Sequence, residues 1–127
     1  MNESARILVV DDDESIRKTV AAILEEKGYI VDTAENGKEA IEKTNVNFYN
    51  LALIDIRLPD IEGIKLLAEM KETTPKMVKI IVTGYPSLQN AITAYQNGAD
   101  AIVVCPLFLK QLPDLEALVH SVSRTSH

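Results

Sequence analysis

Carboxylates and other polar groups stand directly after the apolar runs of this 127-residue sequence. They are Asp11–Asp12, Asp55, Thr83 and Cys105–Pro106, which follow the runs 7–10, 51–54, 78–82 and 101–104. If these runs are parallel strands, their polar ends meet at one edge of a sheet. Three carboxylates gathered there would raise each other's pKa unless a cation lay among them. Mg²⁺ prefers such oxygen ligands, and a phosphoryl oxygen completing its shell would suit phosphoryl transfer onto a carboxylate.

The elements that must position these groups can be predicted from hydrophobic patterning. Short apolar runs bounded by turn signals are typical of strands buried on both faces. We predict strands at 7–10, 29–31, 51–54, 78–82 and 101–104, and helices that begin at Ser15, at Glu39, after Gly63, at Pro86 or Ser87, and near Pro113. The fourth helix carries its apolar residues at Leu88, Ile92 and Tyr95. Alternating strands and helices favour an α/β fold with helices on both faces of a parallel sheet, and the flavodoxin-like strand order 2-1-3-4-5 is among the few allowed.

Composition narrows the class of protein. The length predicts one domain over residues 1–127, and 25% charged residues is ordinary for a soluble globular chain. The net charge of −6 argues against direct nucleic-acid binding by this domain. A single Cys excludes an internal disulfide framework and fits a reducing cytoplasm. We see no signal peptide and no apolar run long enough for a membrane span, and we expect a cytoplasmic protein.

Each polar group also has a purely structural interpretation. Asp11–Asp13 could cap the first helix, Asp55 could start a turn, and Thr83 could cap the fourth helix. Each of these interpretations is about as plausible as a functional one when it is taken alone. Their coincidence at one edge of one sheet favours the functional interpretation.

The order and spacing of four segments resemble the CheY-like receiver domain of two-component response regulators, over nearly the whole chain. The segments are Ile7–Glu14, Asp55–Gly63, Ile81–Gly84 and Gly98–Pro106. The resemblance implies that Asp55 is the phosphoacceptor, supplied by a histidine kinase or a phosphotransfer protein. It also implies that Asp12 binds Mg²⁺ directly, Asp11 binds largely through water, and the backbone carbonyl of Arg57 is a further ligand.

The resemblance further implies how a signal would leave the domain. Thr83 would be the switch hydroxyl that turns to hold the phosphoryl group. Its turn would repack the face made by the fourth helix, the fifth strand and the fifth helix. A downstream effector protein or an attached output domain would read this face. The oligomeric state stays open, and the fifth strand with its flanking helices is where a homodimer would be sought.

The sequence departs from the family at three places. The family has a Lys before the proline that ends the fifth strand, and Cys105 stands there; its thiol carries no positive charge and is a weak donor. Pro106 is present, and the resemblance allows a cis Cys105–Pro106 bond. Ile102 replaces an aromatic residue that moves with the switch hydroxyl, and the stretch 107–112 is longer and more apolar than usual. We therefore expect phosphorylation of Asp55 with weak or unconventional switching.

Two other functions stay open. A haloacid-dehalogenase-type phosphatase would use the run Asp11–Ser15 as its D-x-D-x-[ST] motif, with Asp11 as nucleophile and Asp13 as general acid. That interpretation leaves Asp55 unexplained. A pseudo-receiver would be an interaction module that takes no phosphate, which the absent Lys favours and the acidic residues oppose. A dinucleotide-binding fold is excluded because no Gly-x-Gly-x-x-Gly follows the first strand.

Overall fold

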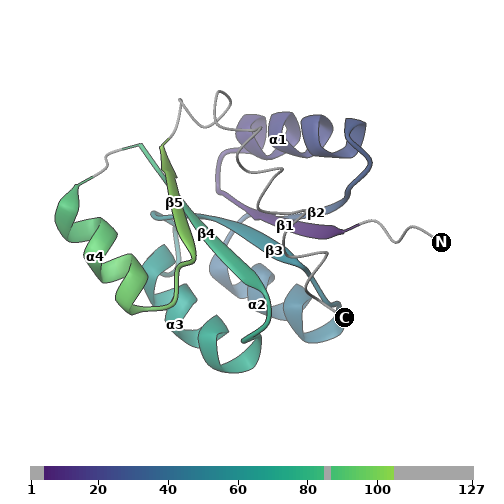
Figure 1. The fold of residues 1–127 in the computed structure, drawn as a ribbon. Coiled ribbons are helices and arrows are strands. Elements are labelled where there is room, and N and C mark those ends of the chain that lie inside the picture. Colours follow the sequence, from purple (N-terminus) through teal and green to yellow (C-terminus); the bar gives the residue numbers. More distant parts are fainter. Residues whose placement is uncertain (1–4, 85–86, 105–127) are drawn as a thin grey trace.

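The computed structural model describes residues 5–84 and 87–104, which form one parallel sheet with helices on both of its faces (Figure 1). The strands are β1 (Arg6–Val10), β2 (Ile30–Ala34), β3 (Leu51–Asp55), β4 (Val78–Thr83) and β5 (Ala101–Val104). The helices are α1 (Glu14–Glu26), α2 (Gly37–Val46), α3 (Gly63–Thr73) and α4 (Leu88–Gln96). The sheet has the order β2-β1-β3-β4-β5 with every pair parallel, so the predicted flavodoxin-like topology is confirmed. The predicted fifth helix lies outside the described residues.

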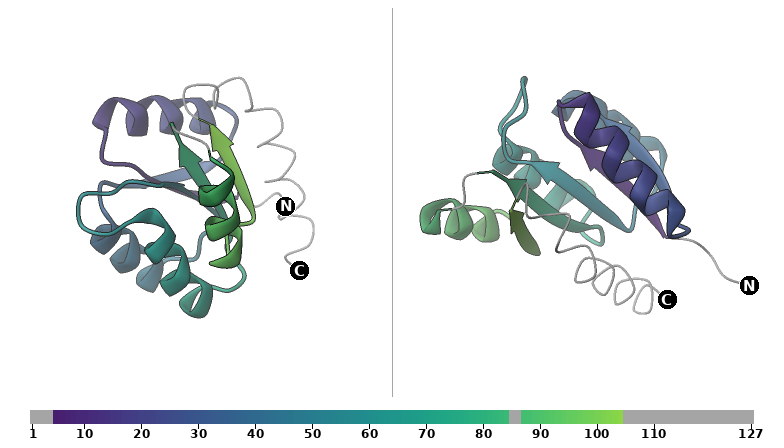
Figure 2. Two further views of the ribbon diagram at one scale, coloured as in Figure 1. Left: turned by 90° about the vertical axis from the view of Figure 1, so that its left-hand side faces the viewer. Right: turned by 90° about the horizontal axis from the view of Figure 1, so that it is seen from above.

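Two apolar cores separate the sheet from its helices. One core joins α1 to the first face of the sheet, where Val20 and Leu24 pack against strand residues such as Ile7. The other joins the opposite face to α2, α3 and α4, and it contains the buried α3 residues Leu66, Leu67 and Met70. The views in Figures 1 and 2 show α1 on one side of the sheet and α2 and α3 on the other. Alternate residues of β1 and β3 enter different cores, which accounts for the continuous apolar runs 7–10 and 51–54 within these strands.

Side-chain caps set where the helices begin. The Asp13 carboxylate accepts hydrogen bonds from the backbone N–H groups of Ser15 and Ile16, so α1 begins one residue before the predicted start. Asn36 caps α2 in the same way, and that helix begins at Gly37 instead of at Glu39. A cap satisfies backbone donors that the first turn of a helix leaves without a partner. These caps explain both differences from the predicted helix starts.

The apolar residues predicted for the fourth helix do not form the face of α4 that packs on the sheet. Leu88, Ile92 and Tyr95 are 78%, 43% and 53% exposed, whereas Ala94 is fully buried. The small residues of this helix therefore face the sheet, and the large apolar residues point outward. Small side chains let a helix approach the sheet closely, and a stripe spaced i, i+4, i+7 does not show which of two surfaces it covers.

The strand β2 begins one residue later than the predicted run 29–31 and continues through Asp32, Thr33 and Ala34, near which the strand was expected to end. It is an edge strand, and half-exposed polar residues fit such a strand without interrupting its pairing with β1. In the part of the chain that the structure describes, no helix is long and apolar enough to cross a membrane.

Candidate functional site

Three carboxylates meet at the carboxyl edge of the sheet. Asp11 and Asp12 follow β1, and Asp55 is the last residue of the neighbouring β3. One carboxylate oxygen from each lies within 4.8 Å of the others. The predicted convergence of these three residues is therefore what the fold produces. The arrangement follows from the pairing of β1 with β3, which places these two strands side by side in the sheet although they are distant in sequence.

Asp11 is the most buried of the three carboxylates, with 7% of its surface exposed. Its Oδ1 accepts the N–H of Asp13 at 2.9 Å, and its own N–H donates to the carbonyl of Ala34. Burial above all, together with the negative charges of Asp55 and Asp12, raises the pKa of Asp11 to about 6 against the lowering effect of the Asp13 hydrogen bond. This carboxyl therefore sits where negative charge is costly and a cation would relieve it.

Asp55 lies half-buried at the end of β3. Burial raises its pKa and so does the charge of Asp12, whereas the Arg57 N–H, which donates to Oδ1 at 3.1 Å, lowers it. Asp12 is exposed. The cluster thus offers one buried, one half-buried and one exposed carboxylate, all with oxygen donors of the type that Mg²⁺ prefers. The donor chemistry and the close approach of the three groups fit a hard divalent cation.

The loop after β3 is folded back on itself. Gly63 donates its N–H to the carbonyl of Ile56 at 2.9 Å, and Arg57 and Glu62 form an isolated antiparallel bridge. A Cβ at Gly63 would lie 2.4 Å from the carbonyl oxygen of Asp55, so only glycine allows this approach. The loop therefore holds the Arg57 backbone next to the end of β3.

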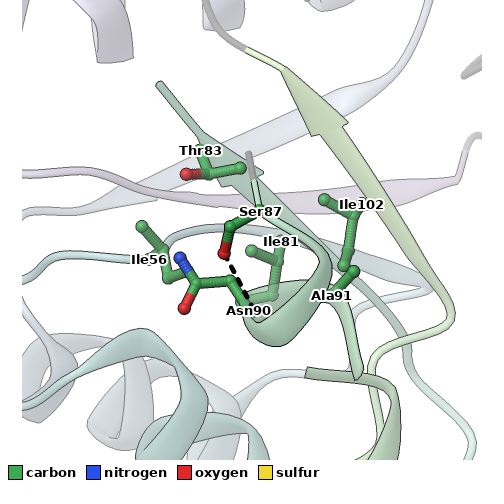
Figure 3. A pocket seen from close by; sticks show the side chains of 7 residues that line it. All are labelled: Ile56, Ile81, Thr83, Ser87, Asn90, Ala91 and Ile102. Atoms are coloured by element: carbon green, nitrogen blue, oxygen red, sulfur yellow. Dashed lines mark hydrogen bonds between the residues drawn. The ribbon is translucent and has the colours of Figure 1, made fainter. Parts of the chain in front are cut away.

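Thr83 ends β4 and is 3% exposed. It borders a cavity of about 40 Å³ between the sheet and α4, which Figure 3 shows with Ile56 on one side and Ile102 and Ala91 on the other. The remaining lining residues are Ile81, Ser87 and Asn90. A cavity of this size holds only a few water-sized groups, so it is no site for an organic ligand. It does leave room beside the Thr83 side chain.

Two residues near the carboxylates were missed by sequence reasoning. The Arg17 guanidinium donates to the backbone carbonyl of Asp11 at 2.7 Å and lies 4.0 Å from the carboxylate of Glu35. The exposed Asp60 accepts hydrogen bonds from two backbone N–H groups of α2. The only sequence signal for Asp60 was its place in a Pro-containing turn, and Arg17 lay on a polar helix face. Neither position indicates its distant partner.

The acidic residues after β1 have different roles in the structure. Asp11 and Asp12 join the cluster, whereas Asp13 caps α1 through its Oδ1. Ile102 lies in β5 and borders the cavity beside Thr83. Cys105 and Pro106, and the apolar stretch 107–112, lie outside the described residues, and so the predictions made for them remain predictions.

Comparison with known proteins identifies the family. Residues 7–116 match the response regulator receiver domain, and the chain belongs to this family. A CheY-like receiver domain from Methanospirillum hungatei superimposes with a TM-score of 0.89 and 39% identity, covering 96% of this chain and 98% of that one. The response regulator TrrA from Thermotoga maritima, solved in complex with Mg²⁺–BeF, has a TM-score of 0.80 and 33% identity over 91% of this chain and 98% of its own.

Curated relatives are longer proteins. The transcriptional regulatory protein ZraR of Klebsiella oxytoca is 40% identical over 121 residues, which cover 94% of this chain and 27% of that protein. The present chain therefore spans about a quarter of this relative.

Proposed function

We propose that this chain is a phosphoacceptor receiver domain in which Asp55 takes a phosphoryl group from a histidine kinase or a phosphotransfer protein. The observation that carries the proposal is the approach of the Asp11, Asp12 and Asp55 oxygens to within 4.8 Å at the edge of the sheet. An Asp55 carboxylate oxygen would attack phosphorus while the bond from phosphorus to the donor breaks, leaving the electron pair on the donor. The product is an acyl phosphate on Asp55.

The residues that would hold Mg²⁺ are Asp11, Asp12, Asp55 and the backbone carbonyl of Arg57. When bound, Mg²⁺ supplies positive charge against the carboxylates and the phosphoryl oxygens. The chain itself orients the acceptor, because the Arg57 N–H holds Oδ1 of Asp55. The raised pKa values of Asp11 and Asp55 support a site built for a cation.

Thr83 is proposed as the switch hydroxyl that turns toward the phosphoryl group. The cavity beside it supports this role because it leaves space for a side chain to rearrange. Ile102 borders the same cavity and lacks the ring that the family uses to follow the hydroxyl. Together with Cys105 in place of the family's Lys, this residue supports an output that differs from the usual one.

The proposed partners follow from the family. Response regulators receive their signal from histidine kinases, and the relatives named above include a transcriptional regulatory protein. We propose a downstream effector or an output domain as the recipient of the signal, in the cytoplasm. A homodimer through α4 and β5 is a further proposal, and the exposed Leu88, Ile92 and Tyr95 on α4 support it. The net charge of −6 supports a domain that does not itself bind nucleic acid.

Phosphorylation can be tested with acetyl phosphate, with and without Mg²⁺, followed by intact mass. We expect the mass of one phosphoryl group on the wild-type chain only with Mg²⁺, and none on Asp55→Ala. Peptide mapping after borohydride reduction should place the label on Asp55. An unlabelled wild-type chain would support the pseudo-receiver instead.

Label that persists in Asp55→Ala and maps to Asp11 would support the phosphatase hypothesis. Two observations oppose that hypothesis. The chain belongs to the receiver family, and Asp13, its proposed general acid, is engaged as the cap of α1.

A further inference from the structure

The loop after β3 is held by a second set of hydrogen bonds, separate from the one between Gly63 and Ile56. Asp60 Oδ1 accepts the N–H of Gly37 at 2.9 Å, and Oδ2 accepts the N–H of Lys38 at 2.9 Å. These are the first two backbone donors of α2, which no intrahelical bond satisfies. The two hydrogen bonds lower the pKa of Asp60 and fit a carboxylate that is held as an acceptor.

The loop and the first turn of α2 are also closely packed at this point. A Cβ at Gly37 would lie 2.2 Å from the Cγ2 of Ile61, so the tip of the loop rests directly on the first turn of α2. Gly37 is buried, and Ile61 packs against the core under α2 and α3. The loop that carries Arg57 is therefore attached to α2 by two hydrogen bonds and one close apolar contact.

The turn that opens α2 also contacts the loop after β1. Glu35 lies 4.0 Å from the Arg17 guanidinium, which in turn donates to the Asp11 carbonyl at 2.7 Å. The backbone of Glu35 is held in turn, because its N–H donates to the Glu39 carboxylate. Residues 35–38 thus lie between two loops that are distant in sequence, one bearing Asp11 and Asp12 and the other bearing Arg57.

We propose that Asp60 is a positioning residue for the metal site, and that its clasp on the first turn of α2 fixes the Arg57 backbone relative to Asp11 and Asp12. The inference rests on the proposed function, in which the Arg57 carbonyl and the three carboxylates hold Mg²⁺. Asp60 acts only through the backbone: without its two acceptor oxygens the loop can shift as a unit, and the Arg57 carbonyl shifts with it. Residues that orient metal ligands in this way typically change metal affinity about 10-fold or more.

The test is calorimetric titration of the whole chain with MgCl₂. We expect Asp60→Ala to bind Mg²⁺ about 10-fold more weakly than the wild type. Asp60→Asn keeps one carboxamide oxygen and should recover part of the loss. Glu62→Ala is the matched control, because it removes an equal charge from an exposed residue of the same loop that makes no capping hydrogen bond. It should bind Mg²⁺ nearly as the wild type does.

Two further measurements separate positioning from a general loss of stability. Amide hydrogen exchange without metal should speed up at Gly37 and Lys38 in Asp60→Ala, and not in Glu62→Ala. Tyr49→Phe removes a hydrogen bond to Asp32, far from the carboxylates, and should lower thermal stability while leaving Mg²⁺ affinity unchanged. A structural role alone would make Mg²⁺ affinity follow stability in both variants.

The results distinguish the two proposals. Equal Mg²⁺ affinity in the wild type and in Asp60→Ala would overturn the inference and leave the proposed function standing. The same would follow if Glu62→Ala weakened binding as much as Asp60→Ala, because the effect would then be one of charge. A wild-type chain that binds no Mg²⁺ would overturn the proposed function and the inference together.

Discussion

Charged groups are paired with partners toward the amino end of the parallel sheet, whereas like charges gather at its carboxyl end. Toward the amino end, charged groups have partners: the Tyr49 hydroxyl donates to Asp32 at 2.6 Å, and the Arg6 guanidinium lies 3.4 Å from the same carboxylate oxygen. The Lys79 ammonium is buried and donates to the carbonyls of Thr74 and Met77. We call this region the amino edge. The Asp32 carboxylate, the Tyr49 hydroxyl and the Lys79 ammonium have hydrogen-bond partners, which lowers the cost of burying them, whereas the Nε of Arg6 is buried without one.

The carboxyl edge gathers Asp11, Asp12 and Asp55, whose mutual repulsion the fold tolerates. Burial and repulsion raise the pKa of Asp11 to about 6 and raise that of Asp55 as well. Pairing at one end of a sheet and repulsion at the other is a sign that the second end serves a ligand and not stability. The candidate site is therefore marked by the mutual repulsion of its carboxylates more than by the presence of acids.

The largest expected effect is a loss of stability from a substitution at the amino edge. Lys79→Met keeps the aliphatic packing but removes both hydrogen bonds, and it leaves the Met77 carbonyl without this donor in a buried place. We expect the free energy of unfolding to fall by about 2 kcal/mol. Burial lowers the pKa of Lys79, so loss of its desolvation cost offsets part of the effect. Urea unfolding measures the change, and Lys76→Met, at an exposed lysine in the turn before β4, is the control.

The same substitution, Asp to Asn, should change the free energy of unfolding in opposite directions at the two edges. Asp32→Asn removes the charge that holds Tyr49 and Arg6, and should lower the free energy of unfolding by about 1.5 kcal/mol. Asp55→Asn removes the repulsion between Asp55 and the other two carboxylates but keeps an acceptor for the Arg57 N–H. Without Mg²⁺ it should therefore raise the free energy of unfolding by about 1 kcal/mol.

Urea unfolding near neutral pH without divalent ions compares the two variants. A loss of stability in both would show that the carboxyl edge is held together by Asp55 as the amino edge is by Asp32. Added Mg²⁺ should stabilise the wild type and Asp32→Asn more than Asp55→Asn, because binding to the native state alone is stabilising.

Much of the site could be predicted from sequence because it depends on strand direction alone. Once 7–10 and 51–54 are buried parallel strands, Asp11 and Asp55 must emerge at the same edge, and the strand order makes them neighbours. Patterning could not show which face of α4 packs inward. The sequence offered a stripe at Leu88, Ile92 and Tyr95, but the sheet is covered by the small residues, including Ala94.

The contacts between loops could not be predicted for a different reason. Asp60 and Gly37 are 23 positions apart, and their approach depends on how the turn after β3 folds back over α2. The same holds for Tyr49 with Asp32 and for Lys79 with the end of α3. Such polar pairs have no period in the sequence, because they depend on tertiary placement and not on the helix or strand repeat.

The smallest expected effect is a pH dependence that arises at the carboxyl edge. A carboxyl whose pKa is raised on folding binds more protons in the native state than in the unfolded state, so stability falls as pH rises. For Asp11, the window lies between its ordinary pKa of 3.8 and its folded value of about 6. Lowering the pH from about 7 to about 5 without metal should therefore raise the free energy of unfolding by about 1 kcal/mol from this group.

Asp11→Asn removes this titrating group together with its coupling to Asp55 and Asp12. Its stability should change less than that of the wild type between about pH 7 and pH 5, as followed by thermal unfolding. Glu25→Gln makes the same charge change at an exposed site on α1 and should keep the wild-type slope. Below about pH 4 the trend should reverse in all three chains, because the pKa of Asp60 is lowered by its bonds to Gly37 and Lys38, and its protonation releases the clasp. An Asp11→Asn slope equal to that of the wild type would place the repulsion of the carboxyl edge elsewhere than on Asp11.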